Sequence, residues 1–305
     1  MIHLKPFRSS LYKSSLISAA AILLAVTLAG CSSGSLLNGM LGGSDSSTMG
    51  AKSGKGGALS PDLAQSDEAS VSGLYNDALA DLKAGSYKSA NKKFAEVERQ
   101  HPYSKWATQA ILMQAFSSYQ NNAYDDSIDS GKRFIALHPG HKDTAYAYYL
   151  VAISEYEQIA DVRRDQSRTE RAVEALDEVA RRFPDSRYAA DATQKAAIGR
   201  DQLAAKEMEI GRYYMKKGSY LAGINRFKKV VTDYQTSTHT PEALYRLAEG
   251  YMALGVVSEA QTAAAVLGHN YPNSEWYKDA YTLVSSDGKA PVASSSSWIS
   301  RVFGV

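Results

Sequence analysis

Along the central part of the chain, apolar and small side chains recur at spacings of three and four residues, which place them on one face of an α-helix. The first clear case consists of Tyr87, Ala90, Phe94 and Val97, and Pro102 follows shortly after them. Because proline lacks the backbone N–H that a helix interior needs, it ends the helix. The pattern therefore predicts one amphipathic helix that begins near Tyr87 and stops before Pro102.

The same offsets return four more times within residues 72–285, starting at Tyr124, Thr169, Tyr220 and Val257. A register that returns in this way is typical of stacked helical hairpins, each of which buries its apolar face against its neighbours. The offsets resemble those of the tetratricopeptide repeat, a two-helix unit. We therefore expect an all-α protein, a tetratricopeptide-repeat α-solenoid of about five helical hairpins. A four-helix bundle accounts less well for the repeated register.

Four of the five predicted second helices are preceded, two positions earlier, by a residue that tolerates a left-handed backbone. These residues are Gly85, Asn122, Gly218 and Gly255. Glycine and asparagine at such places commonly end the preceding helix. They predict a tight turn between the two helices of each of these hairpins.

Two further local signals refine the helical prediction. No proline interrupts residues 186–217, so we expect one long helix there. Pro241 follows Thr240, and this pair predicts a helix whose N-cap is Thr240 and whose first residue is proline.

The N-terminus combines a basic start, an apolar run too short to cross a membrane comfortably, and small residues before a cysteine. Leu28, Ala29, Gly30 and Cys31 resemble the lipobox of bacterial lipoproteins, in which cleavage precedes the cysteine and the thiol receives lipid. We expect residues 1–30 to be a lipoprotein signal peptide and Cys31 to carry acyl chains such as palmitate. Because Ser32 and not aspartate follows the cysteine, the analogy favours the outer membrane over the inner.

Low-complexity segments flank the predicted repeats on both sides. Residues 31–71 begin with the predicted lipidated cysteine and are rich in glycine and serine, so we expect a flexible tether. Residues 286–305 form a serine-rich tail with an apolar end. This end is a candidate for docking on a partner or on the chain's own groove, whereas disorder without function is the plain alternative.

Composition and charge narrow the possible functions. The 305 residues include 34 Lys plus Arg, 32 Asp plus Glu and a single cysteine, with a formal net charge of +2. One cysteine excludes an internal disulfide, and a balanced charge argues against nucleic-acid binding. Removing residues 1–30 takes away three basic residues and no acid, so the remaining chain carries a net charge of −1.

The sequence contains no recognisable catalytic motif. His138 and His141 are separated by Pro139 and Gly140, which prevents their alignment on one helix, so we do not expect a metal site there. An envelope hydrolase, one alternative function, lacks a candidate nucleophile with its base. We expect no enzyme, no metal and no cofactor apart from the covalent lipid on Cys31.

A binding surface is the remaining possibility. If the first helix of each hairpin lines the inner face of a solenoid, the repeat register places an aromatic-rich set of residues there, suited to an extended peptide with aromatic side chains. The alternative is that these residues only pack hairpin against hairpin. The candidates are Tyr75, Leu79, Gln109, Leu112, Phe116, Tyr119, Tyr146, Tyr149, Ile153 and Tyr156.

Several segments carry a closer resemblance. Arg164-Asp165-Gln166, the run 183–189, and Tyr213-Tyr214, together with the lipobox, tether and repeats, resemble the BamD family of outer-membrane β-barrel assembly lipoproteins. The resemblance implies a lipid-anchored adaptor on the periplasmic face of the outer membrane. It also implies three kinds of partner: the barrel-forming subunit BamA, other Bam lipoproteins, and unfolded outer-membrane proteins whose C-terminal signals bind the N-terminal repeats.

The resemblance further implies that repeats four and five contact BamA, and Tyr245, Arg246 and Glu249 are our candidates for that contact. The loop formed by Arg164, Asp165 and Gln166 is interpreted as a structural clamp or as a contact. A different envelope role, in pilus secretin assembly or cell-wall coordination, shares the anchor and the repeats and remains the alternative function.

Overall fold

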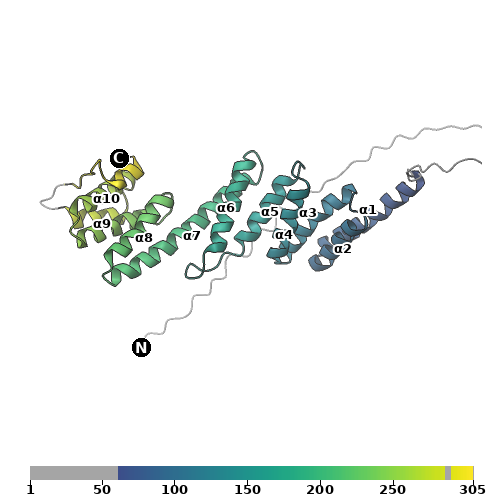
Figure 1. The fold of residues 1–305 in the computed structure, drawn as a ribbon, viewed down its shortest axis with the longest axis horizontal. Helices are drawn as coiled ribbons and strands as arrows, with labels where there is room; N and C mark the ends of the chain where they lie inside the picture. The colour runs from purple at the N-terminus through teal and green to yellow at the C-terminus, as the bar shows by residue number, and fades with distance from the viewer. Residues whose placement is uncertain (1–60, 286–289, 305) are drawn as a thin grey trace, which may run out of the picture. The chain divides into compact units, whose positions relative to one another are not determined.

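The computed structural model describes residues 61–285 and 290–304, with side chains from Glu68 onward. Within them all regular structure is helical (Figure 1). The lipobox residues Leu28, Ala29 and Gly30, the predicted lipid site Cys31 and the first part of the predicted tether lie outside the described residues. The helices are α1 Pro61–Lys83, α2 Tyr87–Gln100, α3 Lys105–Gln120, α4 Tyr124–Leu137, α5 Thr144–Tyr156, α6 Ser167–Arg182, α7 Ala189–Lys216, α8 Tyr220–Asp233, α9 Thr240–Ala253, α10 Val257–Asn270, α11 Glu275–Val284 and α12 Trp298–Phe303.

From α1 to α10, each helix packs mainly against the helices directly before and after it in the chain. The first helices of neighbouring hairpins also contact one another, α1 with α3, α3 with α5, and α5 with α7. This nearest-neighbour pattern is that of a helical solenoid. The predicted all-α array of five hairpins is thereby confirmed, and the first helices share one side of it.

The repeat landmarks mark the starts of the second helices. α2, α4, α8 and α10 begin at Tyr87, Tyr124, Tyr220 and Val257. The third hairpin differs, because α6 begins at Ser167, before the landmark Thr169. Its two helices are joined by a longer loop that has no left-handed residue. The landmark therefore lies two residues inside α6 and not at its first residue.

The predicted left-handed turn residues are confirmed. The backbone φ angle is 76° at Gly85, 58° at Asn122, 73° at Gly218 and 75° at Gly255. A positive φ strains most side chains but not glycine, and asparagine tolerates it better than most residues. Each of these residues forms a tight turn that reverses the direction of the chain, so the two helices of the hairpin lie close together.

The apolar positions of the repeat form the core. Their shared feature is that their side chains are completely shielded from solvent, because each lies between its own hairpin and the next. The largest of them are Phe94, Phe134, Leu176, Phe227 and Leu267. The small residue near the start of each second helix is also buried, which lets the facing helix approach closely; these are Ala90, Ser127, Ala172, Gly223 and Ala260.

The long helix was expected over 186–217, and α7 runs from Ala189 to Lys216. Two glycines in α7 face different neighbours: a Cβ at Gly199 would lie 2.6 Å from Val173 of α6, and one at Gly211 would lie 2.4 Å from Phe227 of α8. The glycines therefore let α7 pack closely against the preceding helix with its first half and against the following helix with its second.

Replacing Gly211 with alanine is expected to lower the free energy of unfolding by about 1–3 kcal/mol, because the added methyl group meets the buried Phe227 ring. Alanine in an open helical position normally stabilises relative to glycine by about 1 kcal/mol. Gly73→Ala in α1 is the matched control, since a Cβ there meets nothing within 4 Å. Urea unfolding of both variants should give changes of opposite sign, and a gain in stability for both would contradict the predicted clash.

Two boundaries differ from the expectation. α1 begins at Pro61, inside the segment 31–71 that the sequence indicated as tether, so the helical part starts before residue 72. Thr240 is not the N-cap of α9, because that place belongs to His239 and Thr240 is already helical. The Thr240 hydroxyl instead donates to the carbonyl oxygen of Tyr234 at 3.0 Å, which fixes α9 against the end of α8.

The described part of the tail, residues 290–304, packs against the last repeats. Ile299 of α12 is fully buried in the cluster that α8, α9 and α10 share. The indole Nε1 of Trp298 donates to the Tyr251 hydroxyl at 3.0 Å, and Lys228 lies 4.7 Å from the centre of the indole ring. Ser297 caps α12 and donates to Glu259 at 2.7 Å. The apolar end of the tail thus docks on its own chain.

Candidate functional site

The N-terminal candidates on α1 belong to the core. Tyr75 is 7% exposed, and its ring centre lies 5.4 Å from that of Phe94 and 5.0 Å from that of Trp106. Burial, with a smaller effect of the Asp143 charge, raises the pKa of Tyr75 to about 12. Leu79 is half-buried against the same cluster. These two side chains hold the first two hairpins together.

On α3 the candidates divide into one buried residue and three half-buried ones. Leu112 is buried, whereas Gln109, Phe116 and Tyr119 keep part of their surface exposed. The Tyr119 hydroxyl donates to the Glu157 carboxylate at 3.4 Å. Burial and then the negative charge of Glu157 raise the pKa of Tyr119 above its ordinary value, so the phenol stays protonated.

The candidates on α5 form the centre of a tyrosine cluster. The rings of Tyr146 and Tyr149 both stack on Tyr188, with centres 5.4 Å and 4.8 Å from it. The Tyr149 hydroxyl donates to the Asp191 carboxylate at 2.6 Å. Burial and this hydrogen bond raise the pKa of Tyr149. Arg187 lies 4.9 Å from the centre of the Tyr188 ring.

The far end of α5 continues the same surface. Ile153 is buried in the core, and Tyr156 is half-buried with the Lys195 ammonium 5.8 Å from its ring centre. Lys195 also pairs with Asp191 at 2.7 Å. The structure therefore brings phenol rings from α5 together with a cation and a carboxylate from α7.

We call the half-buried rings of Tyr146, Tyr149, Tyr156 and Tyr188 the tyrosine surface. Stacked phenol faces offer apolar contact area, and the cations beside them can bind carboxylate groups. The sequence register missed Tyr188, which stacks on two of the predicted residues. Tyr188 precedes α7 and lies outside the counted offsets, and only the loop sequence Arg187-Tyr188 hinted at it.

The loop Arg164-Asp165-Gln166 is closed by its own hydrogen bonds. The buried Gln166 amide donates to the carbonyl oxygens of Asp161 and Arg164, both at 3.1 Å, and accepts from the Thr169 hydroxyl at 3.0 Å. Asp165 accepts from the hydroxyl and the backbone N–H of Ser167, and these bonds hold the pKa of its carboxyl below the usual value. Gln166 and Asp165 fix the start of α6, and Arg164 is exposed.

The candidates on α9 are half-buried in a charged and aromatic cluster. Arg246 donates to Glu249 at 2.8 Å, and its guanidinium lies 5.2 Å from the centre of the Tyr245 ring and 5.6 Å from that of Trp276. The rings of Tyr245 and Trp276 contact each other at 5.4 Å. The cluster presents flat aromatic and guanidinium surfaces at the last repeat.

Glu242 links this cluster to α7. Arg212 donates to both oxygens of its carboxylate, at 2.8 Å and 2.7 Å, and Arg246 approaches at 3.4 Å. Burial by itself raises the pKa of Glu242, but the two guanidinium groups outweigh this effect and hold the pKa below its usual value. Bidentate pairs of this kind fix geometry, so α7 and α9 hold a defined relative position.

Metal binding and membrane spanning find no support in the described part of the chain. In residues 61–285 and 290–304, no three His, Cys, Asp or Glu side chains come together as metal ligands, and no helix is both long and apolar enough to cross a bilayer. The rings of His138 and His141 pack on Phe134, each with its centre 5.4 Å away.

Sequence comparison with known proteins identifies one family of relatives. The YfiO family, described as an outer membrane lipoprotein, matches residues 67–267. The "Outer membrane protein assembly factor BamD" of Caulobacter vibrioides is 43% identical over 275 residues, which cover 90% of this chain and 82% of that protein. The protein of the same name from Rickettsia prowazekii is 46% identical over 218 residues, covering 72% and 87%. A solved tetratricopeptide-repeat protein of Thermus thermophilus covers 70% of this chain and 98% of its own length, at 17% identity and a TM-score of 0.31.

Proposed function

Because this chain belongs to the YfiO family of outer-membrane lipoproteins, whose relatives are BamD assembly factors, we propose that it is a lipid-anchored periplasmic adaptor of the β-barrel assembly complex. In this role it binds the barrel-forming subunit BamA, contacts other Bam lipoproteins and receives unfolded outer-membrane proteins. It is not an enzyme, and its only prosthetic group is the lipid on Cys31. The tyrosine surface is the observation in the structure that best supports this function.

The tyrosine surface is suited to the C-terminal signals of unfolded barrel proteins. Its stacked rings offer flat apolar area, and the Tyr149 hydroxyl, which donates to Asp191, holds its ring in place. Arg187 lies beside the Tyr188 ring, and within the described residues it pairs with no carboxylate, so it supplies positive charge for a peptide carboxylate, whereas Lys195 is already paired with Asp191. Tyr75, Leu112 and Ile153 are too deeply buried to be reached from this surface, so they support it from behind.

The α9 cluster is suited to the contact with BamA. Tyr245, Arg246 and Trp276 combine aromatic area with a guanidinium that is already oriented by Glu249. Aromatic and arginine side chains of this kind are common anchors of protein interfaces, and preorganisation lowers the entropy lost on binding. Because this cluster and the tyrosine surface belong to different repeats, the two partners can bind at the same time.

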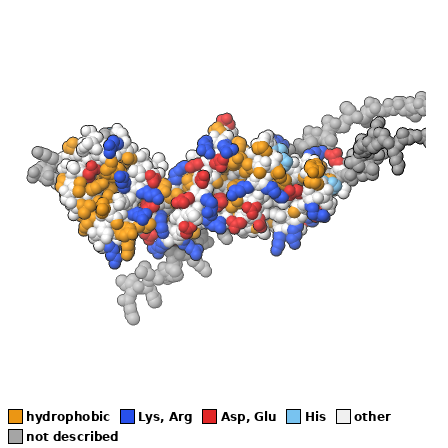
Figure 2. All heavy atoms as spheres, viewed as in Figure 1, with side chains coloured by type: hydrophobic (Ala, Val, Ile, Leu, Met, Phe, Trp, Pro, Cys, Tyr) orange, Lys and Arg blue, Asp and Glu red, His pale blue; other side chains and the backbone are white. Residues whose placement is uncertain are grey.

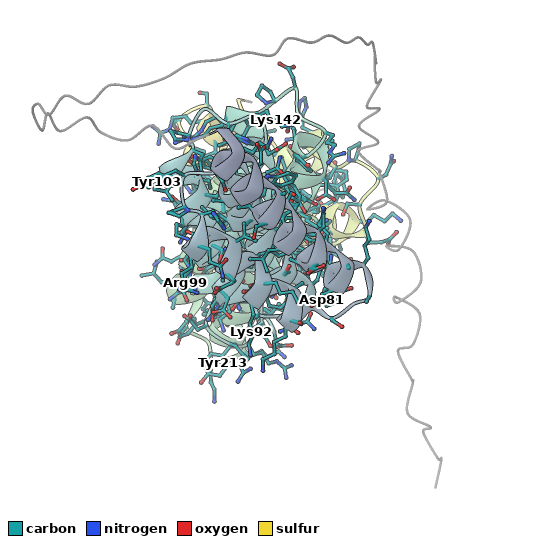
Figure 3. All side chains as sticks on the ribbon, turned by 90° about the vertical axis from the view of Figure 1, so that its right-hand side faces the viewer. Asp81, Lys92, Arg99, Tyr103, Lys142 and Tyr213 are labelled. Atoms are coloured by element: carbon teal, nitrogen blue, oxygen red, sulfur yellow. The ribbon has the colours of Figure 1, made fainter. Side chains whose placement is uncertain are left out.

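Site-specific photocrosslinking in intact cells tests both contacts. A photoreactive phenylalanine in place of Tyr156 should recover unfolded barrel proteins, and one in place of Tyr245 should recover BamA. Tyr103, whose side chain is 101% exposed, is the matched control that should recover neither. Figure 3 shows Tyr103 at the surface of the molecule, pointing away from the helices.

The same experiment distinguishes the adaptor function from a role in another envelope system. Recovery of a pilus secretin or of cell-wall enzymes, without BamA, would show that the chain serves another envelope system. Recovery of BamA at Tyr245 but of no barrel protein at Tyr156 would remove the tyrosine surface from the proposal and leave the adaptor role in place.

A further inference from the structure

Two helical turns in the last two full hairpins expose apolar side chains to solvent. At the α7–α8 turn, Tyr213 is 57% exposed and Leu221 is 65% exposed. At the α9–α10 turn, Leu254 is 45%, Val256 39% and Val257 46% exposed. We call these five residues the turn patch. Singly exposed apolar residues are common, but a group on neighbouring turns marks an interaction surface.

The two turns adjoin each other. A Cβ added at Gly250, near the end of α9, would lie 2.8 Å from Cγ1 of Ile224 and 3.7 Å from Cε of Met215, near the end of α7. α7 and α9 therefore end on the same side of the solenoid, with α8 between them. Figure 2 shows hydrophobic side chains gathered at the end of the molecule that holds α8, α9 and α10, with Lys or Arg side chains at the border.

The charged side chains of the α7–α8 turn are positive, and the α9–α10 turn carries none. No aspartate or glutamate occurs in residues 210–223 or 250–258, which form the two turns and their flanks. Lys216 and Lys217 are exposed at the end of α7, and the Lys217 ammonium lies 5.8 Å from the centre of the Tyr213 ring. Within the described residues, neither lysine pairs with a carboxylate. Their charge is free to act on a partner.

A small cavity extends the positive region. It has a volume of about 220 Å³ and Tyr213 lines it, so it borders the turn patch. Arg163 and Lys206 also line it, and the only carboxylate there, Glu209, is already paired with Arg163 at 3.1 Å. Lys206 donates to the carbonyl oxygen of Arg163 at 3.1 Å, which holds its ammonium at the cavity wall. Because Glu209 offsets Arg163, the side chains that line this open cavity keep one net positive charge, that of Lys206, which can attract a phosphate group.

The shape and composition of this region favour a lipid surface over a protein partner. The apolar residues stand on two convex turns and not in a groove, so they can enter a soft interface without a complementary surface. Leucine, valine and tyrosine flanked by lysine are the composition of surfaces that lie at the boundary of headgroups and acyl chains. Unpaired lysines add attraction to anionic lipids.

We propose that the turn patch inserts shallowly into a bilayer that contains anionic phospholipid, with Lys216, Lys217 and the cavity beside Tyr213 facing the headgroup phosphates. This contact goes beyond the adaptor function and does not depend on it. Together with the lipid on Cys31 it fixes which side of the solenoid faces the membrane.

Fluorescence quenching in protein-free vesicles tests the contact. The probe protein is the chain from residue 31 onward with Cys31→Ser, so that neither acyl chains nor a second thiol interfere. A polarity-sensitive dye is attached through Ser219→Cys in the α7–α8 turn or through Thr236→Cys at the opposite end of α8. With vesicles of phosphatidylethanolamine and phosphatidylglycerol at 3:1, brominated acyl chains should quench the dye at position 219 and leave position 236 unaffected.

Surface variants complete the test. Joint substitution of Leu221, Val256 and Val257 by serine should weaken vesicle binding about tenfold, because shallow insertion scales with buried apolar area. Leu137→Ser is the matched control, since Leu137 is 58% exposed on α4 and lies outside the patch. Joint substitution of Lys216 and Lys217 by glutamine should also weaken binding about tenfold and remove its salt dependence.

The outcomes that overturn the proposal are specific. They are absence of binding to these vesicles, equal quenching at positions 219 and 236, or a triple serine variant that binds as well as Leu137→Ser. Equal binding to vesicles of phosphatidylcholine alone would overturn the role of the cations. None of these results bears on the contacts with BamA, because the vesicles contain no other protein.

Discussion

Phe227→Ala is expected to lower the free energy of unfolding by about 3–5 kcal/mol. The Phe227 ring is completely buried in the cluster that joins α7, α8 and α9, and Gly211 is glycine because the ring lies against it. Removing the ring leaves a cavity that the surrounding helices cannot fill, since Arg212 and Glu242 hold α7 and α9 in place. Urea unfolding followed by circular dichroism measures the change.

The control for this prediction is Tyr103→Ala. The Tyr103 side chain is 101% exposed, so its removal should change the free energy of unfolding by no more than about 0.5 kcal/mol. In a Phe227→Ala background, Gly211→Ala should no longer destabilise, because the atoms that clashed are gone. If Phe227→Ala cost as little as Tyr103→Ala, the proposed coupling of α7 to α8 through this ring would be wrong.

Cys31→Ala is expected to move the protein from the membrane fraction to the soluble fraction. Each methylene of an acyl chain contributes about 0.8 kcal/mol when it enters a bilayer, and two or more chains make an anchor stable. Only the thiol can form the bond to lipid, so alanine removes the whole anchor. Cell fractionation and mass spectrometry of the intact protein measure the result.

Ser32→Ala is the matched control, because it changes the next residue but leaves the thiol. It should fractionate with membranes and keep the mass of the lipidated form. A Cys31→Ala variant that stays with membranes at an unchanged mass would refute the lipid anchor. Weak residual membrane association that disappears in high salt would instead reflect the proposed lipid contact of Lys216 and Lys217 beside the turn patch.

Local sequence signals predicted most of the fold, because they depend on residues close together in the chain. Gly85 and Asn122 mark turns by their own backbone preference, and the offsets that start at Tyr87 repeat the spacing of a helix face. For the apolar tail the sequence left docking on a partner, docking on its own chain and disorder all open, because the partners of Ile299 belong to helices far away in the sequence. The stacking of Tyr188 on α5 was not predicted, for the same reason.

The candidate sites show the limit of the repeat register. Register placed Tyr75 and Tyr149 at equivalent positions, yet one is core and the other belongs to a surface. The difference arises from the neighbouring hairpin: Trp106 covers Tyr75, whereas Tyr149 meets Tyr188 and the carboxylate of Asp191. A register specifies which side of a helix a residue occupies, and only the structure shows what lies opposite.

The docked tail has a consequence for self-association. A stack of identical hairpins leaves an uncovered apolar end, onto which a second molecule can add head to tail, and the process can continue into filaments. Here two helices close that end: α11 packs against α9 and α10, and α12 adds the buried Ile299, with Ser297 bonded to Glu259 and Trp298 to Tyr251. We therefore expect α11 and α12 together to stop head-to-tail stacking after the fifth hairpin.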